Sequence, residues 1–166
     1  MFGGFLDMTE FKNIRRRERA LTEEQAREIL ARAEHGVLST VGADGWPYAV
    51  AVNHVLSGDA LYIHGAMQGH KVENISHEAR VCFCAIASAT VVPAELTTLY
   101  ESAVAFGRAA LVTDPAEKRR ALEALAVRFC GDVTPAAEDE IATTGARTAI
   151  VRISLERITG KSNHSV

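Results

Sequence analysis

Apolar residues recur at intervals of three and four in two stretches of the chain, and this spacing predicts two amphipathic helices. The first begins after Thr22, because Thr22 and Gln25 form a capping box, and it ends near His35 and Gly36. His35 is then expected at the helix C-terminus, where the helix dipole favours a cation. The apolar face of this helix consists of Ala26, Ile29, Leu30 and Ala33.

The second predicted helix begins after Asp114, with Pro115 in the first helical position and Glu117 in the third. It ends near Gly131, a residue type that commonly terminates helices. Residues 132–145 are polar, acidic and interrupted by proline, which predicts a loop. The buried stripe of the second helix is expected to consist of Leu122, Leu125, Ala126 and Phe129.

The remaining apolar stretches predict strands. Tight turns, one of them carrying the pair Asp44 and Gly45, join the first three strands into an antiparallel meander. Gly107 in the fifth strand predicts a bulge or a sharp bend, and residues 88–98 are less regular. Six strands with peripheral helices predict a mainly β fold, a small closed antiparallel barrel. The six strands are residues 36–41, 46–56, 60–64, 79–87, 99–112 and 148–155.

One domain is expected over residues 22–161, with an extended or disordered N-terminal extension at 1–21. Residues 156–166 are predicted to be a tail beyond the last strand, and 162–166 lie outside the domain. The net charge of −3 and the absence of a basic stripe argue against broad nucleic-acid binding. No apolar run is long enough to span a membrane. Three cysteines are too few and too odd for a disulfide framework, which favours the cytoplasm.

Few side chains in the sequence suggest chemistry by their type and spacing alone. The histidines lack the spacing of a helical zinc site and no C-x-x-C accompanies them, so no metal site is predicted. Cys82 and Cys84 share one face of a strand, where small core residues are the usual reading and a soft-metal pair is the alternative. Asn53 is polar within an apolar strand; if buried it needs a partner, and a ligand is one candidate.

The stretch from Leu61 to His77 reads as the end of a strand, a glycine-bearing turn and a short helix. His64, His70 and Lys71 cluster where the strand gives way to the helix. A helix start presents unpaired N–H groups and the positive end of the dipole, so with a lysine it suits a phosphate. The alternative is that Lys71 is a solvated charge and the histidines are incidental.

Five motifs follow one another in a familiar order: L-S-T-V-G-A-D-G-W-P-Y-A-V-A-V-N, L-Y-I-H-G-A-M-Q-G-H-K-V-E-N-I, Y-E-S-A-V-A-F-G-R-A-A-L-V, D-P-A-E-K and I-T-G-K. With them the chain resembles, from Arg15 to Lys161, the pyridoxamine 5′-phosphate oxidase-like FMN-binding split-barrel superfamily. It is most similar to the branch of nitroimidazole resistance (nitroimidazole reductase-like) flavoproteins. The resemblance implies a six-stranded split barrel and a homodimer with FMN at the interface.

The same resemblance implies which residues hold the flavin. One strand offers backbone groups to the ring, a second strand end lies beside it, a basic pair holds the phosphate, and one serine reaches flavin or phosphate. Those positions are Tyr48, Ala49, Val50, Ala51 and Asn53 in the first strand, Ile63 and His64 in the second, His70 and Lys71 in the basic pair, and Ser102.

Three departures from the vitamin B6 oxidases matter. Tyr48 and Asn53 replace an arginine and a lysine beside the flavin, and His70 replaces an arginine. The C-terminal tryptophan and arginine segment that recognises pyridoxal phosphate is missing, since the chain ends in I-T-G-K-S-N-H-S-V. Vitamin B6 oxidation is therefore not expected. Ala51 also stands where the nitroimidazole branch usually carries proline.

Two functions are consistent with these features. The first is an FMN-dependent oxidoreductase that passes electrons from a reduced nicotinamide to a small acceptor such as a nitroaromatic, with His64 as the candidate catalytic residue. The alternative role of His64 is that of a hydrogen-bonded histidine at the end of a strand. The second function is a flavin- or haem-binding carrier or sensor without turnover, in which His64, His70 or His164 is an axial ligand.

Overall fold

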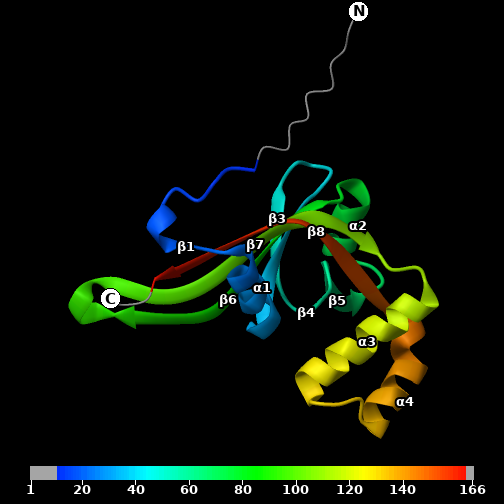
Figure 1. The fold of residues 1–166 in the computed structure, drawn as a ribbon. Coiled ribbons are helices and arrows are strands. Elements are labelled where there is room, and N and C mark those ends of the chain that lie inside the picture. Colours follow the sequence, from blue (N-terminus) through cyan, green and yellow to red (C-terminus); the bar gives the residue numbers. More distant parts are fainter. Residues whose placement is uncertain (1–10, 164–166) are drawn as a thin grey trace, which may run out of the picture.

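One curled antiparallel sheet, with helices packed around it, makes up the molecule (Figure 1). The structure is a computed structural model that describes residues 11–163. The strands are β1 (Ala20–Leu21), β2 (His35–Val41), β3 (Pro47–Asn53), β4 (Val55–Ser57), β5 (Ala60–Ala66), β6 (Arg80–Val92), β7 (Thr97–Leu111) and β8 (Thr148–Asn163). The helices are α1 (Glu23–Arg32), α2 (His70–His77), α3 (Pro115–Cys130) and α4 (Pro135–Thr144), with 3-10 turns η1 (Arg17–Arg19), η2 (Pro93–Glu95) and η3 (Gly145–Arg147).

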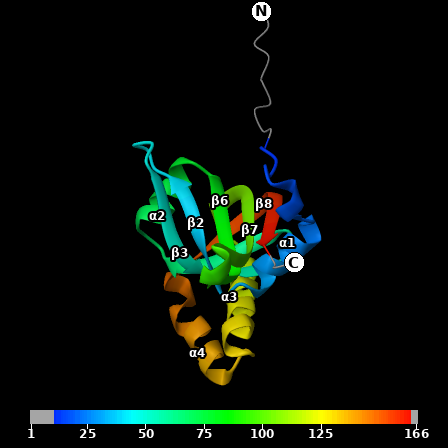
Figure 2. The ribbon, with the colours of Figure 1, turned by 90° about the vertical axis from the view of Figure 1, so that its left-hand side faces the viewer.

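The strand order is β3-β2-β6-β7-β8-β5-β4, with β1 paired to β8. The predicted mainly β, antiparallel architecture of six long strands is therefore confirmed. The predicted meander is wrong: β3 and β4 are consecutive in the chain but form opposite ends of the sheet. The barrel is not closed by strand pairing either, because both of these end strands lack a second partner strand within residues 11–163. The sheet instead curls back on itself around its core (Figure 2).

The single predicted strand 46–56 is interrupted at His54, which joins β3 to β4. Its side chain is fully buried, and its Nε2 lies 2.7 Å from the carbonyl oxygen of Leu30 in α1. The imidazole edge also packs against the ring of Phe83, with 4.7 Å between ring centroids. Apolar residues continue on both sides of the pair Asn53 and His54, so the hydrophobic pattern alone did not distinguish a break from two polar positions within one strand.

Strands β6, β7 and β8 run past the rest of the sheet as a long ribbon (Figure 1). Here two predictions fail. The irregular segment 88–98 is the end of a hairpin that turns at η2, and the tail expected after residue 155 continues β8, with Asn163 paired to Tyr100. The predicted bulge is confirmed, because the β7–β8 register shifts between Phe106 and Gly107. A Cβ at Gly107 would lie 2.2 Å from the carbonyl oxygen of Ser154, so the two backbones approach closely there.

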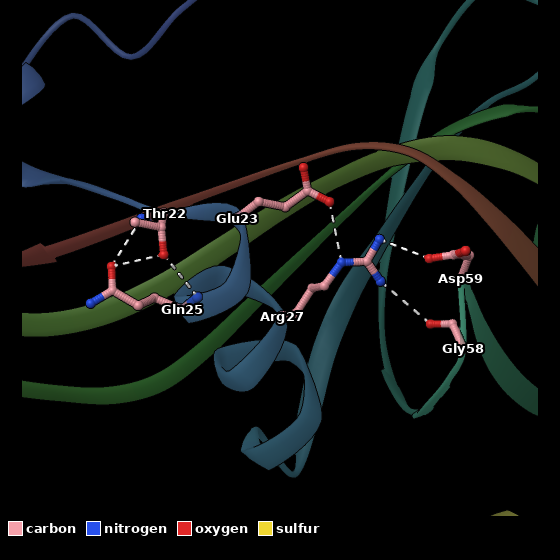
Figure 3. Close-up of polar contacts among 6 residues, drawn as sticks. All are labelled: Thr22, Glu23, Gln25, Arg27, Gly58 and Asp59. Carbon is pink, nitrogen blue, oxygen red and sulfur yellow. Dashed lines mark hydrogen bonds and ion pairs between the residues drawn. The ribbon is translucent and has the colours of Figure 1, made fainter.

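Helix α1 begins at the predicted capping box: Thr22 Oγ1 accepts from the Gln25 N–H, and Gln25 Oε1 accepts from the Thr22 N–H at 2.9 Å (Figure 3). The helix ends earlier than predicted, at Arg32, so His35 belongs to β2 and not to a helix terminus. Arg27 fixes the helix to the β4–β5 turn, since its Nη2 lies 2.9 Å from Asp59 Oδ1 (Figure 3). The end of the predicted extension is also ordered, because β1 pairs with β8.

Helix α3 begins as predicted, with both carboxylate oxygens of Asp114 accepting from N–H groups of the first turn. Ala121 and Leu125 are buried against Ile150 of β8, whereas Phe129, expected in the buried stripe, is exposed. The predicted loop 132–145 is wrong: Thr134 caps α4, which begins at Pro135. Helices α3 and α4 project together from one end of the sheet (Figure 2).

The main core lies inside the curl of the sheet, where α1 covers it. Its largest fully buried side chains include Phe83, Leu38, Ile63 and Ile153 from the sheet and Ile29 and Leu30 from α1. Apolar burial of this kind supplies most of the folding free energy. The core therefore fixes β2, β5, β6 and β8 relative to one another and gives the turns at their ends a rigid support.

Arg128 of α3 places a positive charge near the buried, neutral His54. Its Nη2 donates to the carbonyl oxygen of Ala33 at 2.6 Å, while its Nε has no hydrogen-bond partner in the described part of the chain. Burial lowers the pKa of His54 below its usual range; the Leu30 carbonyl opposes this shift, and the charges of Arg128 and His35 add to it. His54 is thus held neutral in the folded protein.

We expect the stability of the protein to fall as the pH is lowered below about 6.5, because the unfolded state then binds a proton that folded His54 resists. The contribution of His54 to the free energy of unfolding is complete above the pKa that this imidazole has in the unfolded protein. As the pH falls toward its lower pKa in the folded protein, the contribution is lost at up to about 1.4 kcal/mol per pH unit. Denaturant unfolding at pH 7.5 and 5.5 measures it. The variant His54→Gln, although less stable, should lose less on acidification; an equal loss in both proteins would assign the effect to other groups.

Candidate functional site

The start of α2 is the best-defined polar corner of the molecule. Gly69 is the N-cap residue with φ of +124°, a conformation that favours glycine, and no side chain caps the helix. The carbonyl of Gly69 accepts from the N–H groups of Val72 and Glu73, at 2.9 and 3.1 Å. Within residues 11–163 the N–H groups of the first two helical residues, His70 and Lys71, therefore remain available at the positive end of the helix.

Two basic side chains surround this helix start. The ring of His70 lies on that of Tyr48 from β3, with centroids 4.0 Å apart and an interplanar angle of 33°. Lys71 turns back over β5, since a Cβ at Gly65 would lie 2.6 Å from its Nζ. Within one chain, Tyr48 therefore contacts His70, and Lys71 lies over Gly65.

A buried polar contact holds α2 in place. The Nδ2 of Asn74 donates to Thr40 Oγ1 of β2 at 2.9 Å, and both side chains are buried. Val72 and Ile75 are buried on the same helix. Sequence reasoning missed Asn74 and Thr40; the available signal was an asparagine beside apolar helix positions. Because this contact ties α2 to the β2–β3 hairpin, it fixes His70 relative to Tyr48.

Strand β3 presents a small-residue surface. It is a terminal strand of the sheet, and Ala49 and Ala51 are exposed, while Tyr48 and Val50 are half-buried. Such a strand leaves backbone N–H and C=O groups on its outer edge unpaired and approachable. Asn53 is exposed too, and its Nδ2 donates to the carbonyl oxygen of Glu34 at 3.1 Å. Asn53 is thus not buried within one chain, and its side chain already has a hydrogen-bond partner in the protein.

The other predicted residues lie away from Lys71. Ile63 is fully buried in the core, so only its backbone is accessible to a ligand. His64 is exposed and alternates with it, on the strand face that Tyr62 shares; the hydroxyl of Tyr62 donates to Glu117 of α3. The His64 ring makes no hydrogen bond within residues 11–163. It points to the opposite face of β5 from Gly65, over which Lys71 lies.

Ser102 is distant from this corner within one chain. On β7 it pairs with Ile86 and Lys161. The row of paired residues that begins at Ala49 in β3 and runs across β2 and β6 reaches β7 at Phe106. Four residues of strand separate the two rows, roughly 13 Å. The outer sheet face between them is apolar and partly exposed along the row that Ala51, Val37, Cys84 and Val104 form.

The two strand cysteines do share a face, as predicted. Cys82 and Cys84 are half-buried, and desolvation raises the pKa of both thiols, which keeps them protonated and weakly nucleophilic. In the part of the chain that the structure describes, no three metal-binding side chains come together. No helix among residues 11–163 is long and apolar enough to cross a membrane.

The fold and the arrangement of this corner define a split-barrel protein with a curled antiparallel sheet. The chain belongs to the pyridoxamine 5′-phosphate oxidase family, whose model matches residues 22–162. This confirms the family resemblance carried by the sequence motifs. A search of the curated proteins finds no match.

Solved structures give the same fold. A candidate 5-nitroimidazole antibiotic resistance protein of Bacteroides thetaiotaomicron superposes with a TM-score of 0.72 and 21% identity, over 86% of this chain and 85% of that one. A conserved hypothetical protein of Mycobacterium tuberculosis superposes with a TM-score of 0.78 and 19% identity, over 93% of this chain and 97% of that one. An FAD- and haem-binding protein of Mycobacterium smegmatis superposes with a TM-score of 0.70 and 22% identity, over 87% of this chain and 72% of that one.

Proposed function

We propose that the protein is an FMN-dependent oxidoreductase that transfers electrons from a reduced nicotinamide to a small acceptor, with a nitroaromatic as the leading candidate. The observation that carries this proposal is the corner at α2, which combines the ammonium of Lys71 over β5, the ring of His70 on Tyr48 and the N–H groups of a helix start without a side-chain cap. A flavin phosphate needs this combination of a point charge and backbone donors.

The exposed edge of β3 suits the flavin ring. The small side chains of Ala49 and Ala51 let a planar ring approach the backbone, whose free groups can donate to and accept from its polar edge. Bound flavin would supply the redox chemistry, and the protein would bind and orient it. Neighbours of similar fold include a protein named for FAD and haem, so FAD is the competing flavin.

We further propose that the site is completed by a second copy of the chain. Ser102 lies roughly 13 Å along the sheet from the row of paired residues that contains Ala49, so a serine contributed by a second chain would bring this group to a flavin held at β3 and Lys71. The apolar row through Val37, Cys84 and Val104 provides a face for such a homodimer. Three unpaired cysteines are consistent with the cytoplasm as its location.

An absorption spectrum and an anaerobic titration test the proposal. Full-length protein should show the maxima of oxidised flavin after incubation with FMN, and NADH or NADPH should bleach them. Re-oxidation by a nitroaromatic then identifies the acceptor. A flavin spectrum that neither nicotinamide bleaches would contradict the oxidoreductase assignment.

His64 is the residue we propose as proton donor to the acceptor, since its ring is exposed and an imidazole can both carry and release a proton. The variant His64→Ala should slow re-oxidation by the acceptor while its affinity for flavin stays unchanged. Equal re-oxidation rates in the two proteins would leave His64 with a structural role.

A carrier or sensor that binds haem is the second candidate, and the FAD- and haem-binding neighbour favours it. Of the three candidate axial ligands, His64 is exposed, His70 has one ring face covered by Tyr48, and His164 lies outside the described residues. A Soret band after addition of haem, lost in His64→Ala but kept in His70→Ala, would support this function.

A further inference from the structure

A cavity of about 580 Å³ lies between α3, the α4–η3 segment and the ends of β5 and β7. This volume is within the range of small-molecule sites. Its walls are mainly apolar and come from elements far apart in the sequence. They include Met67, Leu111, Val112, Leu122, Ile141 and Ala146.

The cavity exists because α4 is poorly packed. None of its residues is fully buried, and Ile141 of α4 and Leu122 of α3 both line the space while remaining half-exposed. Near η3 the packing is loose, because a Cβ on Gly145 would lie 3.6 Å from Leu122 Cδ1. An apolar group in this space would bury surface that the protein itself leaves open to water.

Two cations of α3 line the same cavity, and they differ. Arg119 is neutralised, because its guanidinium lies 2.6 Å from Glu123 and 3.5 Å from Glu138. Lys118 is half-buried at the cavity wall, and within residues 11–163 it forms no ion pair. The site therefore combines an apolar interior with one uncompensated positive charge, which attracts a single anionic group.

The described ends of the chain do not reach this cavity. Phe11 packs on Phe106 with 5.1 Å between centroids, and Asn163 pairs with Tyr100. Leu111, which lines the cavity, is five residues further along β7 than Phe106 and eleven further than Tyr100. These separations correspond to roughly 16 and 36 Å of strand. The occupant must therefore come from outside these parts of the chain.

We propose that this α3–α4 cavity binds a small organic acid whose aromatic or branched aliphatic body fills the apolar space and whose carboxylate pairs with Lys118. The proposal does not depend on the flavin assignment, because it uses neither Lys71 nor β3. Ligand binding would tie α4 to α3 and stabilise the fold, since the ligand binds only the native state.

Titration of the full-length protein with 2-naphthoate, followed by the fluorescence of the probe, tests the proposal. We expect saturable binding, and about tenfold weaker binding by Lys118→Gln, which loses a charge-assisted hydrogen bond. The neutral analogue 2-naphthalenemethanol should bind both proteins equally. Arg120→Gln, a neighbouring exposed cation outside the cavity, is the matched control and should bind 2-naphthoate like the parent protein.

A second variant locates the probe. Ala146 is exposed and lines the cavity, so Ala146→Trp fills the space without entering the core. We expect it to fold, as circular dichroism shows, and to lose binding of 2-naphthoate. At ten times its Kd the probe should raise the melting temperature of the parent by about 3–6 °C and leave that of Ala146→Trp unchanged. Full binding by Ala146→Trp, equal affinity in Lys118→Gln, or no saturation up to about 1 mM would each overturn the proposal.

Discussion

Replacing Gly107 by alanine is expected to lower the free energy of unfolding by about 3–5 kcal/mol. The added Cβ would lie 2.2 Å from the carbonyl oxygen of Ser154 and 3.0 Å from its carbonyl carbon. Both atoms belong to the backbone of β8, so a rotamer change cannot relieve the clash. The strands must separate where the β7–β8 register shifts, within one of the long strand pairings of the sheet.

Denaturant unfolding of Gly107→Ala beside Gly131→Ala measures this effect. Gly131 ends α3 with φ of +83°, and a Cβ there meets nothing within 4 Å. Its replacement therefore costs only the left-handed conformation, about 1–2 kcal/mol. If Gly107→Ala loses no more stability than Gly131→Ala, the close approach of β7 and β8 at this position is wrong.

Removing the ammonium of Lys71 should weaken flavin binding by about 1.5–3 kcal/mol, or roughly ten- to 150-fold, the loss of a charge-assisted hydrogen bond to phosphate. Fluorescence titration of Lys71→Ala with FMN measures it. Titration with riboflavin, which lacks the phosphate, should show little difference between the variant and the parent. An unchanged FMN affinity would remove Lys71 from the phosphate site.

Two further variants sharpen that experiment. Lys118→Ala removes a lysine from α3, outside the corner at α2, and should leave FMN affinity unchanged. Gly65→Ala keeps the charge but places a Cβ 2.6 Å from the Lys71 Nζ. The lysine end is flexible and can move aside, so this variant should fold normally and bind FMN more weakly than the parent. Normal binding by Gly65→Ala would show that the ammonium need not lie over β5.

Local signals in the sequence predicted the parts of the fold that local interactions decide. The capping box at Thr22, the Asp114 cap and the bulge at Gly107 depend on residues close to one another in the chain or on one glycine. What failed depends on distant partners. No local pattern shows that the chain crosses the sheet at His54, because the acceptor for that ring is Leu30 of another element.

The residues of the candidate site also fall into those that local sequence predicts and those that depend on distant contacts. His70 and Lys71 were found because a strand, a glycine turn and a helix start are consecutive in the sequence. Asn74 and Thr40 were missed because their contact spans 34 residues. The end of β8 after residue 155 was missed because Ile158 is its one large apolar residue, and α4 was missed because none of its residues is buried, so periodicity gave no signal.

The place of β8 in the sheet has a consequence for synthesis of the protein. Of the strands within residues 11–163, β8 is synthesised last, yet it lies between β7 and β5 in the strand order and also pairs with β1. Until it emerges, β3-β2-β6-β7 and β5-β4 are separate sheets, and at 5–20 residues per second the 82 positions from Ala66 to Thr148 take roughly 4–16 s. A nascent or truncated chain without β8 therefore exposes two open strand edges, the feature that promotes aggregation between chains.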